Sequence, residues 1–139
     1  MTRSTIQKIT IGFGAIYVLI GVLGFIPGIT QFSERFGAVP GEGMLLGIFA
    51  VNVIHNIAHL LLGGALILGG RSSGAVITTN RIMAVVFVVL AIASLIAPLV
   101  EGVNLNAPDT ILHLASAALT AYLGFLADRQ ATGATSPAR

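Results

Sequence analysis

The sequence has no cysteine and no tryptophan, and only 9% of its 139 residues are charged. Without cysteine the chain forms no disulfide, no thiolate metal site and no cysteine nucleophile. A soluble domain normally carries about a quarter charged residues to cover its surface. Because 55% of the residues are hydrophobic and the mean hydropathy is +0.97, most of the surface must face lipid. The seven Lys and Arg residues form no basic run, which argues against nucleic acid as a partner.

Four continuous apolar stretches are each close to the roughly 20 residues that a helix needs to cross the hydrocarbon core. They lie at about residues 9–26, 44–68, 82–100 and 107–126. Helices satisfy their own backbone hydrogen bonds in lipid, whereas barrel strands would alternate apolar and polar residues over shorter segments. The sequence therefore predicts an all-α polytopic membrane protein, a four-transmembrane-helix bundle. The third stretch has no ionisable residue and is expected to be the most exposed to lipid.

The bundle is predicted to form one domain, residues 1–128, followed by a disordered cytoplasmic tail at residues 129–139, which is polar and rich in small residues. The first outer loop, residues 27–43, is long for a bundle connection. Its TQFSERF portion, residues 30–36, suits either a short interfacial helix with Phe32 and Phe36 toward lipid or an ordered cap over the bundle mouth. The cap is the preferred interpretation.

The basic residues predict the orientation of the helices. Six of the seven cations fall in segments that an even number of spans places on one side of the membrane: Arg3, Lys8, Arg71, Arg81, Arg129 and Arg139. By the positive-inside rule this side is the cytoplasm. The expected location is the bacterial plasma membrane, with N- and C-termini cytoplasmic and the first helix an uncleaved span. The lipid bilayer is the expected partner, and both a homo-oligomer and an unidentified membrane partner fit the composition.

The second and fourth apolar stretches align without gaps. HNIAHLLLGGALILGG, from His55, matches DTILHLASAALTAYLG, from Asp109, so that His59 faces His113. In each half a helix ends near a proline, and an outer loop leads to a helix with an ionisable residue four positions before a histidine. The pattern predicts two tandem helical hairpins with parallel topology.

Polar side chains form one stripe on each of these two helices. At 100° per residue, each stripe falls within about one 100° arc. The stripe of the second helix is Asn52, His55, Asn56 and His59, and that of the fourth is Asp109, His113, Ser116 and Thr120. Because polar groups are costly in hydrocarbon, we expect the two stripes to face each other, with His55 and His113 nearly level. The first helix has a stripe suited to close backbone approach, Gly14, Tyr17, Gly21 and Gly24.

Three functions fit this polar interior. The preferred one is a non-enzymatic accessory or structural component whose buried polar groups hold the helices together. Each hydrogen bond between membrane helices contributes roughly 1 kcal/mol to their association. The second is a metal- or haem-binding membrane protein. His55 and His59 at i, i+4, with His113 and Asp109 from the facing helix, would bind a transition metal, or histidines would serve as axial ligands to haem. The third is conduction of protons or small solutes along the histidines.

Catalysis has little support in the sequence. Ser116 lies one helical turn from His113, but on the same helix and without a recognisable oxyanion hole. The glycines of GFGAIYVLIG lie in a membrane span and do not follow a strand, so they are not a phosphate-binding loop. We therefore expect no enzymatic activity.

Three segments together carry a family resemblance: GFGAIYVLIGVLGFIPG, NVIHNIAHLLLGG and DTILHLASAAL. With four spans, they make the chain resemble domain of unknown function 4383, a group of small four-helix bacterial membrane proteins. The likeness covers about residues 3–129. It implies a fold and a membrane location, and it carries no catalytic residue to transfer.

Overall fold

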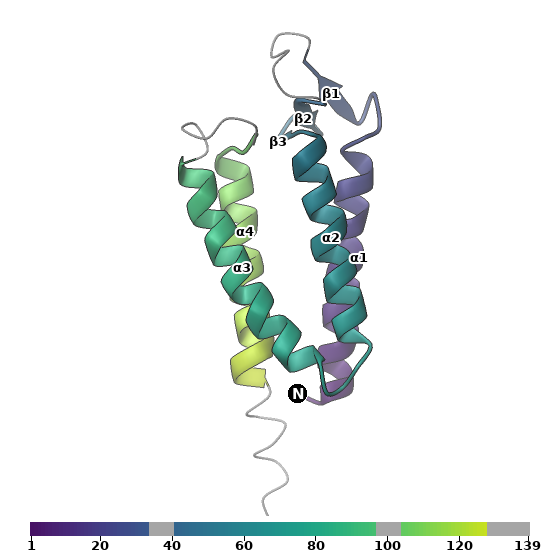
Figure 1. Ribbon diagram of the computed structural model, residues 1–139, viewed down its shortest axis with the longest axis vertical. Helices are drawn as coiled ribbons and strands as arrows, with labels where there is room; N and C mark the ends of the chain where they lie inside the picture. Colours follow the sequence, from purple (N-terminus) through teal and green to yellow (C-terminus); the bar gives the residue numbers. More distant parts are fainter. Residues whose placement is uncertain (34–40, 97–103, 128–139) are drawn as a thin grey trace, which may run out of the picture.

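The computed structural model is a bundle of four long helices, described over residues 1–33, 41–96 and 104–127 (Figure 1). The helices are α1 (Arg3–Leu23), α2 (Val53–Gly70), α3 (Val76–Ile96) and α4 (Ala107–Ala121), the last extended by a π-helical segment, η3 (Tyr122–Leu126). All four, α4 together with η3, are long and apolar enough to cross a membrane. The predicted all-α four-helix fold is confirmed, and the architecture is that of a multi-pass membrane protein.

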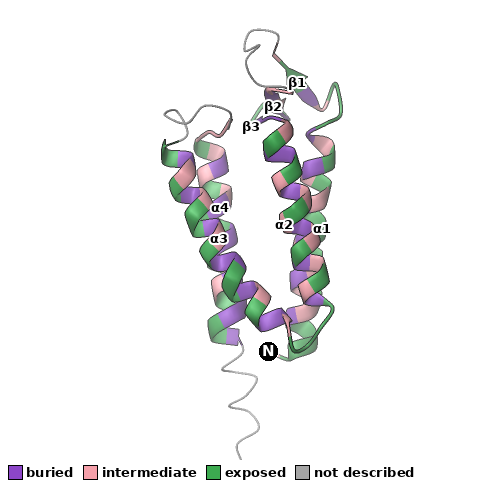
Figure 2. Ribbon diagram, in the orientation of Figure 1, coloured by how far each residue is buried: buried purple, intermediate pink, exposed green. Residues whose placement is uncertain are grey.

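The helices pair in chain order as two hairpins. α1 packs along α2, and α3 packs along α4. α1 begins and η3 ends at one end of the bundle, and the connection from α2 to α3 turns at that end too (Figure 1). In Figure 2 the outward faces of the helices are largely exposed, and among the described residues the most exposed large hydrophobic side chains are Leu61, Leu95 and Ile111. These faces are the ones that lipid would cover.

A small antiparallel sheet lies at the other end, above α1 and α2 (Figure 1). Its strands are β1 (Thr30–Phe32), β2 (Gly43–Leu45) and β3 (Phe49–Val51), in the order β1-β2-β3. Thr30 pairs with Leu45, and Gly43 pairs with Val51. Residues 30–32 are therefore strand and not the interfacial helix considered above, because their backbone bonds to β2. The remainder of that tract, residues 34–36, lies outside the described residues, as do Arg129 and the rest of the tail.

The second membrane helix begins at Val53 and not at residue 44. Leu46 and Gly47 both have positive φ, 55° and 70°, which makes the tight turn between β2 and β3. Such a conformation cannot continue a right-handed helix. Asn52 then caps α2, its side chain accepting a hydrogen bond from the backbone N–H of His55. Apolar composition alone does not distinguish this hairpin from a helix.

α1 and α3 extend beyond their apolar stretches at the end where the chain begins. α1 starts at Arg3 instead of residue 9, and α3 at Val76 instead of residue 82. Hydropathy marks the hydrocarbon region, whereas the polar first turns of these helices suit the headgroup region. α3 is also not the most exposed helix, since 39% of its span is buried against 28% for α1. It packs on α4 and also contacts α1, where Asn80 Nδ2 donates to Thr10 Oγ1 at 2.8 Å.

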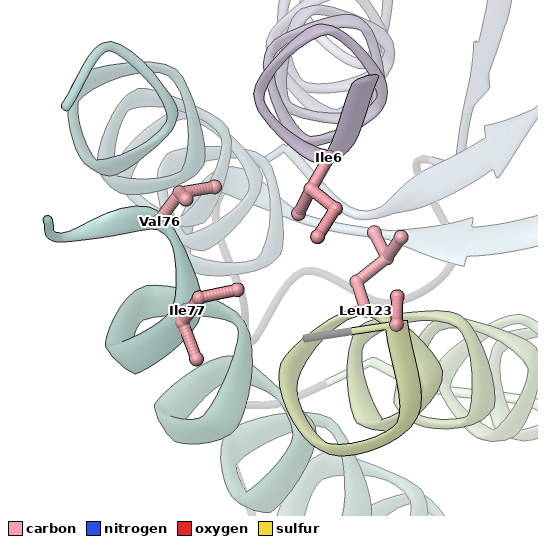
Figure 3. Close-up of a cluster of buried hydrophobic side chains, with 5 residues drawn as sticks. Ile6, Val76, Ile77 and Leu123 are labelled. Atoms are coloured by element: carbon pink, nitrogen blue, oxygen red, sulfur yellow. The ribbon is translucent and has the colours of Figure 1, made fainter. Parts of the chain in front are cut away.

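Two apolar clusters join the hairpins. The first contains Ile6, Val76, Ile77, Leu123 and Ala127, and it brings α1 against α3 and η3 (Figure 3). The second contains Tyr17, Leu66, Met83, Phe87 and Ala117, in the middle of the bundle. Packing of this kind is a main source of association between membrane helices, because lipid is as apolar as the side chains.

Glycines set the distance between α1 and α2. A Cβ atom added to Gly14 would lie 2.7 Å from the carbonyl oxygen of Gly63, and one added to Gly63 would lie 2.6 Å from that of Gly14. Such distances leave no room for a side chain on either residue. The two backbones therefore touch at this crossing, as in small-residue contacts between membrane helices.

Candidate functional site

α2 and α4 start in the same way, which fixes their polar side chains at equivalent places. Asn52 caps α2 and accepts from the N–H of His55 at 2.8 Å. Asn106 caps α4 and accepts from the N–H of Asp109 at 3.3 Å, while the Asp109 carboxylate accepts from the N–H of Asn106 at 2.8 Å. The latter pair forms a capping box. The repeat seen in the sequence therefore extends to the caps.

One turn further along each helix, a histidine enters the centre of the bundle. His59 and His113 are 3% and 2% exposed, and their ring centroids are 6.4 Å apart. His113 thus lies beside His59, its counterpart in the repeat. The expected pairing of His113 with His55 at one level differs from this arrangement, because α2 begins at Val53 and places His55 in its first turn.

Four rings, one from each helix, surround this point, and we call them the four-ring cluster: Tyr17, His59, Phe87 and His113. Tyr17 stacks on His59 with centroids 5.0 Å apart, and Phe87 lies 6.5 Å from His113 with nearly parallel planes. Tyr17 and Phe87 close the circle at 5.1 Å. His55, one helical turn nearer the sheet, stacks on His59 with ring centroids 4.6 Å apart. Aromatic pairs at these separations are favourable by about 0.5–1.5 kcal/mol each.

A hydrogen bond between hairpins accompanies the cluster. The hydroxyls of Tyr17 and Ser116 are 2.7 Å apart. Because Ser116 Oγ gives its only hydrogen to the carbonyl of Leu112, at 2.7 Å, Tyr17 must be the donor. The bond joins α1 to α4 inside the protein.

The backbone fixes which nitrogen carries the hydrogen in two imidazoles. His59 Nδ1 lies 3.2 Å from the carbonyl oxygen of His55, and His55 Nδ1 lies 3.1 Å from that of Asn104. A carbonyl only accepts, so both Nδ1 atoms donate, and in a neutral ring Nε2 is then a bare acceptor. Within residues 1–33, 41–96 and 104–127, His59 Nε2 is buried without a hydrogen-bond partner, and so is Nδ1 of His113.

Two cavities adjoin these rings. One of about 180 Å³ lies between His59 and His113, with His55 and apolar side chains, including Ala58, Leu62 and Leu90, completing its wall. A second, of about 140 Å³, lies under the sheet. It shares His55 and His59 with the first and reaches Asp109. Both are smaller than the roughly 300–1,000 Å³ pockets typical of drug-sized ligands and cofactors.

All eight residues of the two polar stripes are buried: Asn52, His55, Asn56, His59, Asp109, His113, Ser116 and Thr120. They do not all meet at one place. Asn52 and Asp109 serve the caps, and Asn56 faces α1, where a Cβ added to Gly24 would collide with its side chain. Thr120 donates to the carbonyls of Ser116 and Ala117 on its own helix. His55, His59, His113 and Ser116 are the members that gather around the rings.

Three contributors were absent from the predicted stripes. Asn106 stands where Asn52 stands in the repeat, so extending the alignment by three residues would have found it. Asn104, whose carbonyl holds His55, lies in a segment without a pattern. Phe87 is one apolar residue in an apolar helix, and nothing in the sequence around it indicates a place among the central rings.

The metal hypothesis requires that His55, His59, His113 and Asp109 converge. Among the described residues, no three His, Cys, Asp or Glu side chains are grouped closely enough to hold a metal ion. His55 and His59 direct their Nδ1 atoms to carbonyl oxygens, and Asp109 bonds to its own helix cap. These contacts leave the Nε2 atoms of His55 and His59, together with the His113 ring, as the available nitrogens.

Comparison with known proteins gives a match to a protein family. The family model described as domain of unknown function (DUF4383) matches residues 7–126. No curated protein and no solved structure matches the chain.

Proposed function

The chain belongs to the DUF4383 family, and we propose that it is a non-enzymatic accessory or structural protein of the bacterial plasma membrane. In this proposal a His-lined polar interior between α2 and α4 joins the two hairpins. The observation that carries it is the four-ring cluster, to which every helix contributes one ring. Because the hydrophobic effect does not draw helices together in lipid, ring contacts and buried hydrogen bonds add to apolar packing as the interactions that hold the hairpins together.

The bonding of the polar groups supports a role without catalysis. Ser116 Oγ both donates to Leu112 and accepts from Tyr17, so its hydrogen is not shared with His113. A serine nucleophile needs a base within hydrogen-bond reach. Asp109 is engaged in its capping box, 2.8 Å from the N–H of Asn106.

Charge supports the proposed orientation, with both termini in the cytoplasm. Arg3 and Lys8 lie in the first turns of α1, and Arg71 and Arg81 flank the turn to α3 at the same end of the bundle. Glu42 and Asp109 lie toward the other end. This asymmetry is the one that the positive-inside rule describes.

The test is whether the interior histidines stabilise the fold more than lipid-facing residues of the same helix. His113→Ala is expected to lower the free energy of unfolding in detergent by about 2–4 kcal/mol, as for large-to-small changes in a packed core. Leu114→Ala is the matched control, because Leu114 is 54% exposed. Titration with a denaturing detergent measures both. Equal stabilities of the two variants would contradict the proposal.

The competing function is metal or haem binding, favoured by two buried ring nitrogens, on His59 and His113, that have no hydrogen-bond partner in the described part of the chain. An absorption spectrum and an elemental analysis of the purified protein separate the two functions. A colourless protein without metal supports the structural role. A Soret band or a stoichiometric transition metal, lost in both His55→Ala and His113→Ala, would replace it.

A further inference from the structure

We infer that the cavity of about 180 Å³ between the hairpins is a binding site for a small, membrane-soluble molecule of the phenol class, whose hydroxyl bonds to His59 and His113. The inference rests on the proposed function only for its location in the interior between the hairpins. It adds a ligand, which a purely structural role does not require.

The first support is the pair of unsatisfied nitrogens. Buried polar groups nearly always have a hydrogen-bond partner, yet His59 Nε2 and His113 Nδ1 have none among the described residues. Both residues line this cavity and are more than nine-tenths buried. An occupant that bonds to them would remove the cost of leaving two polar atoms bare in an apolar interior.

The chemistry of the two rings defines the polar part of the occupant. Since His59 Nδ1 donates to the His55 carbonyl, its Nε2 needs a donor. No backbone bond fixes the tautomer of His113 in the described chain, so this ring is able to donate. A hydroxyl donates once and accepts as well. With centroids 6.4 Å apart, the rings are close enough for one oxygen to bond to both.

The remaining wall defines the apolar part. Apart from the imidazoles, the cavity is lined by Ile54, Ala58, Leu62, Leu90 and Leu105. Its volume is near the roughly 150 Å³ of an engineered apolar cavity that binds benzene. A single water between the two histidines would leave most of the apolar cavity empty, and further water molecules would lack the two to four polar partners that each needs. A six-membered ring that carries a hydroxyl matches both the size and the polarity.

The cavity is also within reach of lipid. Ile54, on its wall, is 56% exposed on the face of α2 that the bilayer would cover. A neutral aromatic molecule dissolved in the membrane would therefore enter from the side without crossing an aqueous phase. A phenol is preferred to an aliphatic alcohol, because its more acidic hydroxyl is the stronger donor to a bare imidazole nitrogen.

The experiment measures binding of 4-fluorophenol to the full chain in mild detergent by ¹⁹F NMR, with 4-fluoroanisole as the ligand that lacks the donor. Saturable binding of 4-fluorophenol is expected, about tenfold tighter than that of 4-fluoroanisole, as for one hydrogen bond. His59→Phe keeps an aromatic ring and is expected to remove this difference.

A second pair of variants tests whether the ligand binds in this cavity, without substituting a histidine. Ala58→Leu fills the cavity and is expected to abolish binding, whereas Ala65→Leu, on an exposed face of the same helix, is expected to leave it unchanged. Equal affinity for the two ligands, no saturable binding, or full binding by Ala58→Leu would overturn the inference. So would a stoichiometric metal in the purified protein. If binding fails while His113→Ala still destabilises the protein, the structural role stands without the ligand.

Discussion

His59 shows how one backbone contact determines what a buried side chain offers. Its Nδ1 donates to the carbonyl of His55 at 3.2 Å, and this bond leaves the buried Nε2 of the neutral ring as an acceptor. His113 has no such contact among the described residues and therefore keeps both tautomers available. Two histidines at equivalent positions of a repeat thus have different hydrogen-bonding capacity.

The hydroxyl of Tyr17 is predicted to stabilise the contact between the hairpins. Tyr17→Phe removes its hydrogen bond to Ser116 but keeps the ring and its stacking on His59. The free energy of unfolding is expected to fall by about 0.5–1.5 kcal/mol. Denaturing-detergent titration measures the change. Tyr122→Phe is the control, because Tyr122 is 38% exposed, and a similar loss in both variants would contradict the assignment.

Among the elements, α1 and α2 depend on glycine in a way that α3 and α4 do not. Gly14 and Gly63 bring the two backbones into contact, and this approach places Tyr17 against His59. α3 approaches η3 through a different glycine, since Arg81 Nε donates to the carbonyl of Gly124 at 2.7 Å.

Neighbouring glycines of α2 are predicted to respond oppositely to the same substitution. In Gly63→Ala the new Cβ would lie 2.7 Å from the backbone nitrogen of Val18. The free energy of unfolding is therefore expected to fall by about 1–3 kcal/mol. A Cβ added to Gly64 would have no described atom within 4 Å apart from its own helix backbone, so Gly64→Ala should be neutral or stabilise by up to about 1 kcal/mol. The stabilities of the two variants are compared by following the helical circular dichroism signal during thermal unfolding in detergent. If the free energy of unfolding fell as much in Gly64→Ala as in Gly63→Ala, close backbone contact at Gly63 could not be the cause of the destabilisation.

Across the whole molecule, the two hairpins are joined at three levels. At the end with the sheet, Asn106 Nδ2 donates to the carbonyl of Ile48 at 2.8 Å. The four-ring cluster lies in the middle. At the end where the chain begins, Asn80 bonds to Thr10 beside the apolar cluster of Ile6 and Val76. Each level combines packing with a hydrogen bond, which suits an environment in which apolar burial alone has little driving force.

The proposed orientation predicts which exposed positions are accessible from outside the cell. Because the chain has no cysteine, a single introduced cysteine is labelled without background. Gln31→Cys, on β1, should react with a membrane-impermeant maleimide in intact cells. Ser73→Cys, in the turn between α2 and α3, should react only after permeabilisation. The reverse pattern would place both termini outside and would refute the proposed topology.

The sequence by itself determined the features that depend on local chemistry. Hydropathy identified four spans because a membrane helix needs a continuous apolar run. The spacing of His55 and His59, and of Asp109 and His113, placed each pair on one helix face because the period is 3.6 residues. The repeat also indicated the hairpin pairing, since each half carries the same order of helix, loop and polar helix start.

Only the tertiary structure decided which of these groups meet. Asn56 shares a stripe with His59, yet the crossing at Gly14 and Gly63 turns it toward Gly24 on α1. Phe87 joins the central rings, although nothing in its apolar helix distinguishes it from its neighbours. The rotation and separation of packed helices depend on contacts between segments far apart in the chain. No local pattern records those contacts, so the partners of the two central histidines had to come from the fold.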